Sequence, residues 1–119
     1  MPIVSDEIHS ELLYTGHQHV PIASLSPEIE QNSITLIAPS KTFNLAGLQC
    51  SLAIIPNAEL RNRYVAARAG LGNWVNVMGL IAAEAAYRDV EEGRAQRRPY
   101  LKANRGGVSG FVAEQMAGV

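Results

Sequence analysis

The stretch Ala38-Pro39-Ser40-Lys41-Thr42-Phe43-Asn44-Leu45-Ala46-Gly47-Leu48 is a polar turn that carries one lysine between two apolar segments. Residues 33–37 before it have the β-branched, partly alternating character of a strand, and residues 52–55 after it form a short apolar run that Pro56 ends. We therefore expect Lys41 on a loop between two buried strands. A lysine in that place is partly desolvated, which favours a neutral and nucleophilic amine. The alternative is an ammonium that reaches solvent over the rim of the sheet, and the loop alone favours this alternative because most lysines are exposed.

The composition is that of one ordinary globular domain. The chain has 119 residues, of which 47% are hydrophobic and 18% are charged, with a net charge of −1. A charge so close to zero argues against a general nucleic-acid or membrane-surface binder, and no apolar run reaches the length of a membrane span. The single cysteine, Cys50, has apolar neighbours, which predicts a buried thiol in a reducing compartment. No secretory leader pattern opens the chain, so we expect a cytoplasmic protein.

Two acidic residues follow another predicted strand, at residues 2–5. Asp6 and Glu7 stand at its carboxyl end with His9 close behind, and in open α/β sheets ligands bind at that end. Successive strand residues point to opposite faces, so the two carboxylates should have different roles. The alternative is that both cap the next turn or face water. The three histidines of the chain lack the paired spacing of structural zinc motifs, and we expect no metal site.

Helix signals lie between and after the strands. Ser26-Pro27-Glu28 predicts the start of a short helix, and Asn57 predicts the cap of a longer one that reaches Gly70. An alanine-rich helix is predicted over residues 75–88. The alternation of strands with helices or loops is typical of an α/β fold.

The last quarter of the chain is strongly charged. Residues 91–98, followed by Pro99, predict a solvated connection, and a last helix is predicted from Tyr100 to Met116, weakened by a pair of glycines. Five basic residues fall in this region: Arg94, Arg97, Arg98, Lys102 and Arg105. Tyr100 is the one aromatic residue among them, too few to stack a series of bases, so we interpret them as a solvent-exposed linker rather than a phosphate-binding patch.

Asp6 and Lys41 occupy equivalent places after two predicted strands. Each follows a predicted strand, and loops at the carboxyl ends of neighbouring strands can open on the same edge of a sheet. Pyridoxal phosphate requires such a pair: a lysine that holds its aldehyde as an imine, and a carboxylate that keeps its pyridine nitrogen protonated.

Ser5-Asp6-Glu7-Ile8-His9, followed by the stretch 38–48, closely resembles the class I/II aminotransferase family of fold-type-I pyridoxal-phosphate enzymes. It is most similar to the cystathionine β-lyase (MalY/PatB-like) branch, whose members cleave carbon–sulfur bonds. The resemblance continues through residues 53–57, 75–77 and 100–105, and so covers nearly the whole chain.

The resemblance implies a central fragment of a protein several times longer. Residues 1–90 would be part of the large pyridoxal-phosphate-binding domain of an aspartate-aminotransferase-like α/β fold. Residues 91–119 would be the linker and helix that lead into the small domain.

The resemblance also implies roles for four residues. Lys41 corresponds to the lysine that binds the cofactor aldehyde and later removes the α-proton of the substrate. Asp6 corresponds to the carboxylate that pairs with the pyridinium nitrogen, and His9 to the position that contacts the 3-oxygen of the cofactor. Ser40 lies in the segment that helps to bind the cofactor phosphate.

Two positions depart from the family pattern at that phosphate. The position three before Lys41, often serine in relatives, is Ala38, and the position eight after it, often arginine, is Gln49. Phosphate binding would therefore depend on other groups.

The expected function is that of a carbon–sulfur β-lyase, or a fragment of one, which releases thiol, pyruvate and ammonia from a sulfur-containing amino acid. An aminotransferase is the alternative within the family. A non-catalytic α/β remnant or interaction module is the alternative of another class, and independent activity of the 119 residues is not expected. The family implies a homodimer, with no nucleic-acid or membrane partner.

Overall fold

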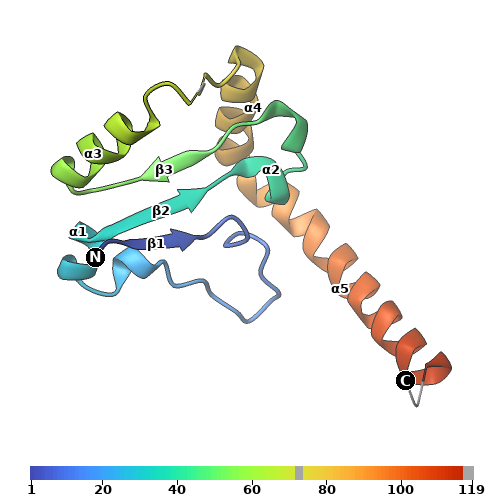
Figure 1. The fold of residues 1–119 in the computed structure, drawn as a ribbon. Coiled ribbons are helices and arrows are strands. Elements are labelled where there is room, and N and C mark those ends of the chain that lie inside the picture. Colours follow the sequence, from blue (N-terminus) through green and yellow to red (C-terminus); the bar gives the residue numbers. More distant parts are fainter. Residues whose placement is uncertain (72–73, 117–119) are drawn as a thin grey trace.

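Strands at the amino-terminal half of the chain build one small mixed sheet. The structure is a computed structural model that describes residues 1–71 and 74–116. Its strands are β1 (Ile3–Asp6), β2 (Ser33–Ile37) and β3 (Leu52–Ile54), and they lie in that order in the sheet (Figure 1). β1 runs parallel to β2, and β3 runs antiparallel to β2. The three predicted strands and the α/β class are thus confirmed.

The register of the sheet sorts side chains onto two faces. Asp6 is paired with Leu36, which is paired in turn with Ala53. Paired residues on neighbouring strands point to the same face, so these three side chains share one face of the sheet. Glu7 follows Asp6 and its N–H donates to the carbonyl of Leu36 at 2.9 Å, while its buried side chain turns to the other face. The prediction that the two carboxylates point apart is confirmed.

Short helices join β1 to β2 and β3 to the rest of the chain. The segment after β1 leads through η1 (Ile22–Ser24) into α1 (Pro27–Gln31), where Ser26 Oγ accepts a hydrogen bond from the N–H of Ile29. α3 (Ala58–Arg68) starts at Asn57, whose side-chain oxygen accepts from two backbone N–H groups. Both predicted caps are confirmed, because the side chains satisfy amides that a helix start leaves unpaired.

The lysine stretch contains two short helical turns. α2 (Pro39–Thr42) carries Lys41, and η2 (Ala46–Leu48) follows it. Asn44 and Gln49 have positive φ angles of 57° and 51°, and these two positions turn the chain back from β2 toward β3. Lys41 therefore lies on one turn of helix inside the predicted loop.

α4 (Val77–Arg88) packs its first turn against η2. Asn76 caps the helix by accepting from the N–H of Gly79 at 2.8 Å, and its amide donates to the carbonyl of Leu48 at 3.0 Å. A Cβ atom added at Gly79 would lie 2.6 Å from that same carbonyl oxygen. The glycine is required by this close approach, and the predicted helix is confirmed with its first residue two positions later.

The chain ends in α5 (Val90–Gln115), a helix of 26 residues that projects away from the sheet (Figure 1). The prediction of a non-helical connection at residues 91–98 is therefore wrong. That segment consists mostly of Glu, Arg, Ala and Gln, which favour helix, and the backbone continues past Pro99 despite a cost of about 3 kcal/mol for an interior proline. The helix predicted to follow is confirmed as the carboxyl-terminal part of α5.

The described part of the chain has a small core. Its buried apolar residues are Ile34, Ala38, Cys50, Ile55 and Ala83, and Cys50 is a free thiol as predicted. β1 and β3 are less buried than expected, since Val4 is 62% and Ile54 48% exposed. The radius of gyration is 18.1 Å, against roughly 13–14 Å for a compact domain of this length.

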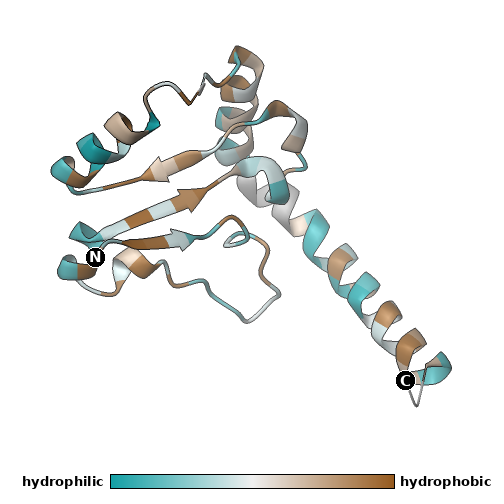
Figure 2. Ribbon diagram, in the orientation of Figure 1, coloured by the Kyte–Doolittle hydropathy of each residue, from teal (hydrophilic) through white to brown (hydrophobic). Residues whose placement is uncertain are grey.

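Apolar residues lie on α4 and along the outer half of α5 (Figure 2), and several of these side chains are exposed. Within the described ranges, no helix is both long enough and apolar enough to span a membrane.

Candidate functional site

The carboxyl ends of β1 and β2 lie at one edge of the sheet. Two of the predicted site residues, Asp6 and Lys41, lie at or just after these strand ends. Asp6 is the last residue of β1, and α2 with Lys41 begins two residues after the end of β2 (Figure 1). Because the two strands are parallel and Asp6 is paired with Leu36, the carboxylate and the lysine turn belong to the same edge. The parallel pairing therefore brings the two segments together as expected.

Asp6 lines a cavity of about 460 Å³ on its face of the sheet, which we call the Asp6 cavity. Ala38 and Gln49, the two positions that depart from the family pattern, line the same cavity. Arg68, from the last turn of α3, brings a guanidinium to the lining, with its carbon CZ 5.5 Å from the centre of the Tyr64 ring. The cavity thus combines an exposed carboxylate with a cation from another element.

Lys41 is exposed on α2, which is the alternative that the loop alone favoured over a partly desolvated lysine. The turn that carries it is nevertheless anchored. Thr42 is only 3% exposed, and the ring of Phe43 meets that of Tyr87 on α4 edge to face at 5.7 Å. Burial, and then the nearby Cys50, raise the pKa of Tyr87. The backbone position of Lys41 is fixed from one side while its amine faces solvent.

His9 and Ser40 lie at the same edge but in different settings. His9 is exposed in the turn after β1, where its carbonyl accepts from the N–H of Leu12 at 2.9 Å. Ser40 is half-buried on α2, next to Lys41, and its carbonyl accepts from the N–H of Leu45 at 3.1 Å. The backbone of each is therefore held by a local turn.

Glu7 is a residue whose role the sequence did not reveal. Its carboxylate accepts hydrogen bonds from Ser5 Oγ at 2.9 Å, from Nε2–H of His19 at 2.7 Å and from the N–H of Ile22 at 3.0 Å. Burial by itself raises the pKa of Glu7, but these hydrogen bonds outweigh burial and hold the pKa below its ordinary value. Glu7 is thus an ionised anchor between β1 and the segment that leads to η1.

Two of the basic residues of α5, Arg97 and Arg105, contact aromatic rings, which corrects for these two the interpretation of a solvent-exposed linker. The guanidinium of Arg97 lies over the Phe43 ring at 5.6 Å, and that of Arg105 lies over the Tyr14 ring at 4.1 Å. Arg97 and Arg98 are both half-buried. These contacts tie α5 to α2 and to the segment after β1.

The residues that sequence reasoning missed are those whose partners lie far along the chain. The alternation in β1 indicates that Glu7 faces away from Asp6, but nothing in the sequence names His19 as its partner. Arg68 is an ordinary basic residue at the end of a helix, and only the fold brings it to the cavity that Asp6 lines.

This geometry defines a class: a mixed α/β sheet unit with an acid at the end of one strand and a lysine turn after the parallel neighbour. The aminotransferase class I and II model matches residues 1–109. The chain therefore belongs to the aminotransferase class I and II family.

Individual relatives give the same picture. Cystathionine beta-lyase PatB of Bacillus subtilis is 41% identical over 116 residues, which are 96% of this chain and 30% of that protein. Aspartate aminotransferase of Geobacillus stearothermophilus is 33% identical over 96 residues, 81% of this chain and 24% of that protein. The crystal structure of cystalysin from Treponema denticola, which contains pyridoxal 5'-phosphate, superposes with a TM-score of 0.88 at 31% identity, covering 95% of this chain and 29% of that one.

The fold is accordingly that of part of an aspartate-aminotransferase-like, fold-type-I protein. The chain spans about 30% or less of the length of the relatives just described.

Proposed function

We propose that these 119 residues are part of a pyridoxal-phosphate-dependent carbon–sulfur β-lyase that acts on a sulfur-containing amino acid. The observation that carries the proposal is the shared edge of β1 and β2, from which Asp6 and the Lys41 turn both project. The 41% identity to a protein named cystathionine beta-lyase supports the choice of reaction within the family.

In this proposal the cofactor, when bound, supplies an electron-withdrawing ring. The Asp6 carboxylate keeps a proton on the ring nitrogen, which a carboxylate near a cationic partner can do because the ion pair favours both charges. The Lys41 amine would hold the cofactor covalently and, once the substrate amine has displaced it, would be free to take the α-proton of the substrate as a general base. His9 contacts the 3-oxygen, and Ser40 contributes to phosphate binding.

The residues of the Asp6 cavity fit the cofactor in part. The carboxylate lies in the lining, as the ring nitrogen requires, but Ala38 and Gln49 bring no positive charge to the phosphate. Lys41 is not among the described lining residues, so its amine would have to reach the cofactor from the adjoining α2 turn. Arg68 lines the same cavity and offers a guanidinium that matches a phosphate group. We assign the phosphate charge to Arg68 in this chain, and the remaining contacts to polypeptide outside these residues.

The test uses the only two lysines of the sequence, Lys41 and Lys102. The chain is incubated with pyridoxal phosphate, reduced with borohydride, digested and mapped by mass spectrometry. We expect a phosphopyridoxyl group on Lys41 far in excess of Lys102, which is also exposed and lies on α5. Equal labelling of both lysines, or none at Lys41, would contradict the proposed role of Lys41.

An aminotransferase is the second candidate, favoured by the 33% identity to aspartate aminotransferase. The two reactions differ in products: β-elimination from cystathionine gives pyruvate, ammonia and a thiol, whereas transamination leaves the carbon skeleton intact as a 2-oxo acid. Measuring ammonia and thiol in a cofactor-loaded form therefore separates them.

Three further properties belong to the same proposal. Residues 1–90 form part of the large cofactor-binding domain, and residues 91–119 form the linker and helix toward the small domain. The protein is cytoplasmic, in agreement with the buried free thiol of Cys50. It forms a homodimer, which sedimentation of the cofactor-bound form would test.

A further inference from the structure

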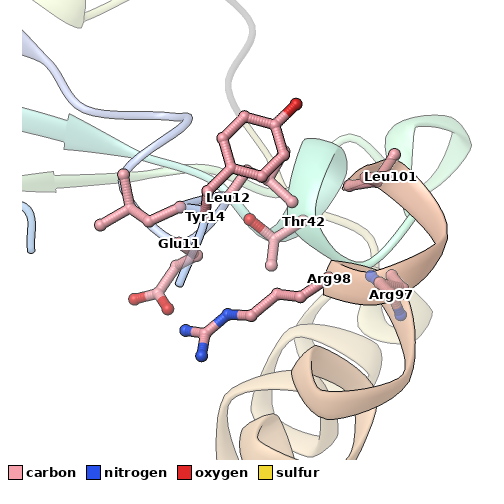
Figure 3. A pocket seen from close by; sticks show the side chains of 8 residues that line it. Glu11, Leu12, Tyr14, Thr42, Arg97, Arg98 and Leu101 are labelled. Atoms are coloured by element: carbon pink, nitrogen blue, oxygen red, sulfur yellow. The ribbon is translucent and has the colours of Figure 1, made fainter. Parts of the chain in front are cut away.

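A second cavity lies between α2 and α5, on the side where Arg97 and Arg98 of α5 approach the segment after β1. It has a volume of about 220 Å³ and is lined by residues 11–14, by Thr42, and by Arg97, Arg98 and Leu101 (Figure 3). Pockets that bind drug-sized ligands have volumes of about 300–1,000 Å³, so this smaller cavity suits a smaller molecule. We call it the Thr42 cavity.

Thr42 gives the cavity a buried polar group with no partner in the described structure. The residue is 3% exposed, its Oγ1 is buried, and no hydrogen bond is made to that atom by the described residues. Buried hydroxyl groups normally have a partner, so an unpaired one in a cavity wall indicates a place for an acceptor or donor from a ligand. Thr42 directly follows Lys41, so its position is fixed by the same anchored turn.

Two guanidinium groups give the cavity its charge. Arg98 extends from α5 past Thr42 toward Glu11, and its Nε is buried without a hydrogen-bond partner among the described residues (Figure 3). Arg97 is on the same lining and lies over the Phe43 ring at 5.6 Å. The Glu11 carboxylate brings a negative charge to the same lining. Among the lining residues that the structure describes, the two guanidinium groups outnumber the one carboxylate, and this excess of positive charge favours an anionic ligand.

The other described residues of the lining are Tyr14 and three leucines. Leu12 and Leu13 come from the segment after β1, and Leu101 comes from α5, one turn beyond the arginines. Side chains of this kind bury a short hydrocarbon group, while the hydroxyl and guanidinium groups bind a polar end.

From this arrangement we propose that the Thr42 cavity binds a small carboxylate with a short apolar tail. The carboxylate accepts hydrogen bonds from Thr42 Oγ1–H and from the guanidinium of Arg98, with Arg97 adding charge, and the tail lies against the three leucines. Lys41 takes no part in this binding, so the inference does not depend on the proposed cofactor chemistry.

The test uses 4-methylpentanoate as the probe, because it has no aldehyde or ketone group that could form an imine with an amine. Calorimetric titration of the full 119-residue chain should give saturable binding. Binding should weaken at least tenfold for the uncharged 4-methylpentanamide, at least tenfold for Arg98→Gln and several-fold for Thr42→Val, which keeps the shape of the side chain and removes the hydroxyl. Arg88→Gln on α4 is the matched control and should bind as the unmodified chain does, and circular dichroism checks that each variant is folded.

A second measurement needs no variant. Modification by phenylglyoxal, followed by peptide mapping, should be slowed at Arg97 and Arg98 by 4-methylpentanoate but not by the amide, and should be unchanged at Arg88. The proposal is overturned if no saturable binding occurs, if the amide binds as well as the acid, or if the two arginines are not protected. Labelling of Lys41 by pyridoxal phosphate is scored separately, so either proposal can fail while the other stands.

Discussion

The Glu7 carboxylate accepts a hydrogen bond of 2.7 Å from Nε2 of His19 and thereby ties the end of β1 to a residue twelve positions later. The side chain of Glu7 is 6% exposed and that of His19 is 32% exposed, so the contact is largely shielded from water. The same carboxylate also binds Ser5 and the N–H of Ile22. The Glu7 side chain therefore holds the polar segment between β1 and η1 against the sheet, on the face opposite to that of Asp6.

Glu7→Gln should lower the free energy of unfolding by about 1–3 kcal/mol at neutral pH. The amide is neutral and keeps one acceptor oxygen, so all three donors lose a charged partner and at least one of them loses its acceptor in a buried place. Urea denaturation followed by circular dichroism measures the change. His17→Gln is the matched control, since His17 is exposed in the same segment and its replacement should cost less than about 0.5 kcal/mol. Equal effects of the two variants would contradict the anchoring role.

The stabilisation by Glu7 should depend on pH in the acid range. Its pKa in the folded chain lies below the ordinary value of 4.5, so the unfolded chain takes up the proton first as the pH falls. The contribution is therefore complete above pH 4.5 and is lost as the pH drops through the lower pKa of the folded state. The difference in stability between the natural chain and Glu7→Gln should shrink over that range. A difference that stays constant from neutral to acid pH would count against an ionised Glu7.

Two glycines in helices should respond to alanine in opposite directions. At Gly79 a new Cβ would lie 2.6 Å from the carbonyl oxygen of Leu48, so Gly79→Ala must push α4 away from η2 and destabilise the chain by about 1–3 kcal/mol. At Gly107 on α5 a Cβ meets nothing within 4 Å, and Gly107→Ala should stabilise by about 0.5–1 kcal/mol. Thermal unfolding of both variants provides the comparison, and a stabilising Gly79→Ala would disprove the close approach.

Local signals predicted much of this fold correctly. Ser26 and Asn57 cap the helices that they were expected to cap, because an N-cap depends on residues only two or three positions away. The prediction for residues 91–98 was wrong. The charges and the following proline indicated a connection, but the helix propensity of these residues and the helical turns on either side continue α5 through Pro99.

The sequence predicted only those parts of the candidate site that the order and direction of the strands place together. Asp6 and Lys41 each follow a strand, and parallel pairing then brings their segments to one edge. The contacts of Glu7 with His19 and of Arg97 with Phe43 join segments that are distant in sequence, so no spacing rule could find them. The exposure of Lys41 likewise depends on which elements cover α2, and its sequence neighbours do not determine that.

Asp6→Asn should separate cofactor attachment from turnover in any form of the protein that binds the cofactor. The amide cannot hold a proton on the ring nitrogen as a carboxylate does, so release of pyruvate from cystathionine should fall by about 100-fold or more. Covalent labelling of Lys41 after borohydride reduction should remain, because Asp6 does not form that bond. Asp89→Asn is the control, since Asp89 is the other aspartate of the sequence and is exposed at the end of α4. Undiminished β-elimination by Asp6→Asn would remove Asp6 from the role that its place at the end of β1 suggests.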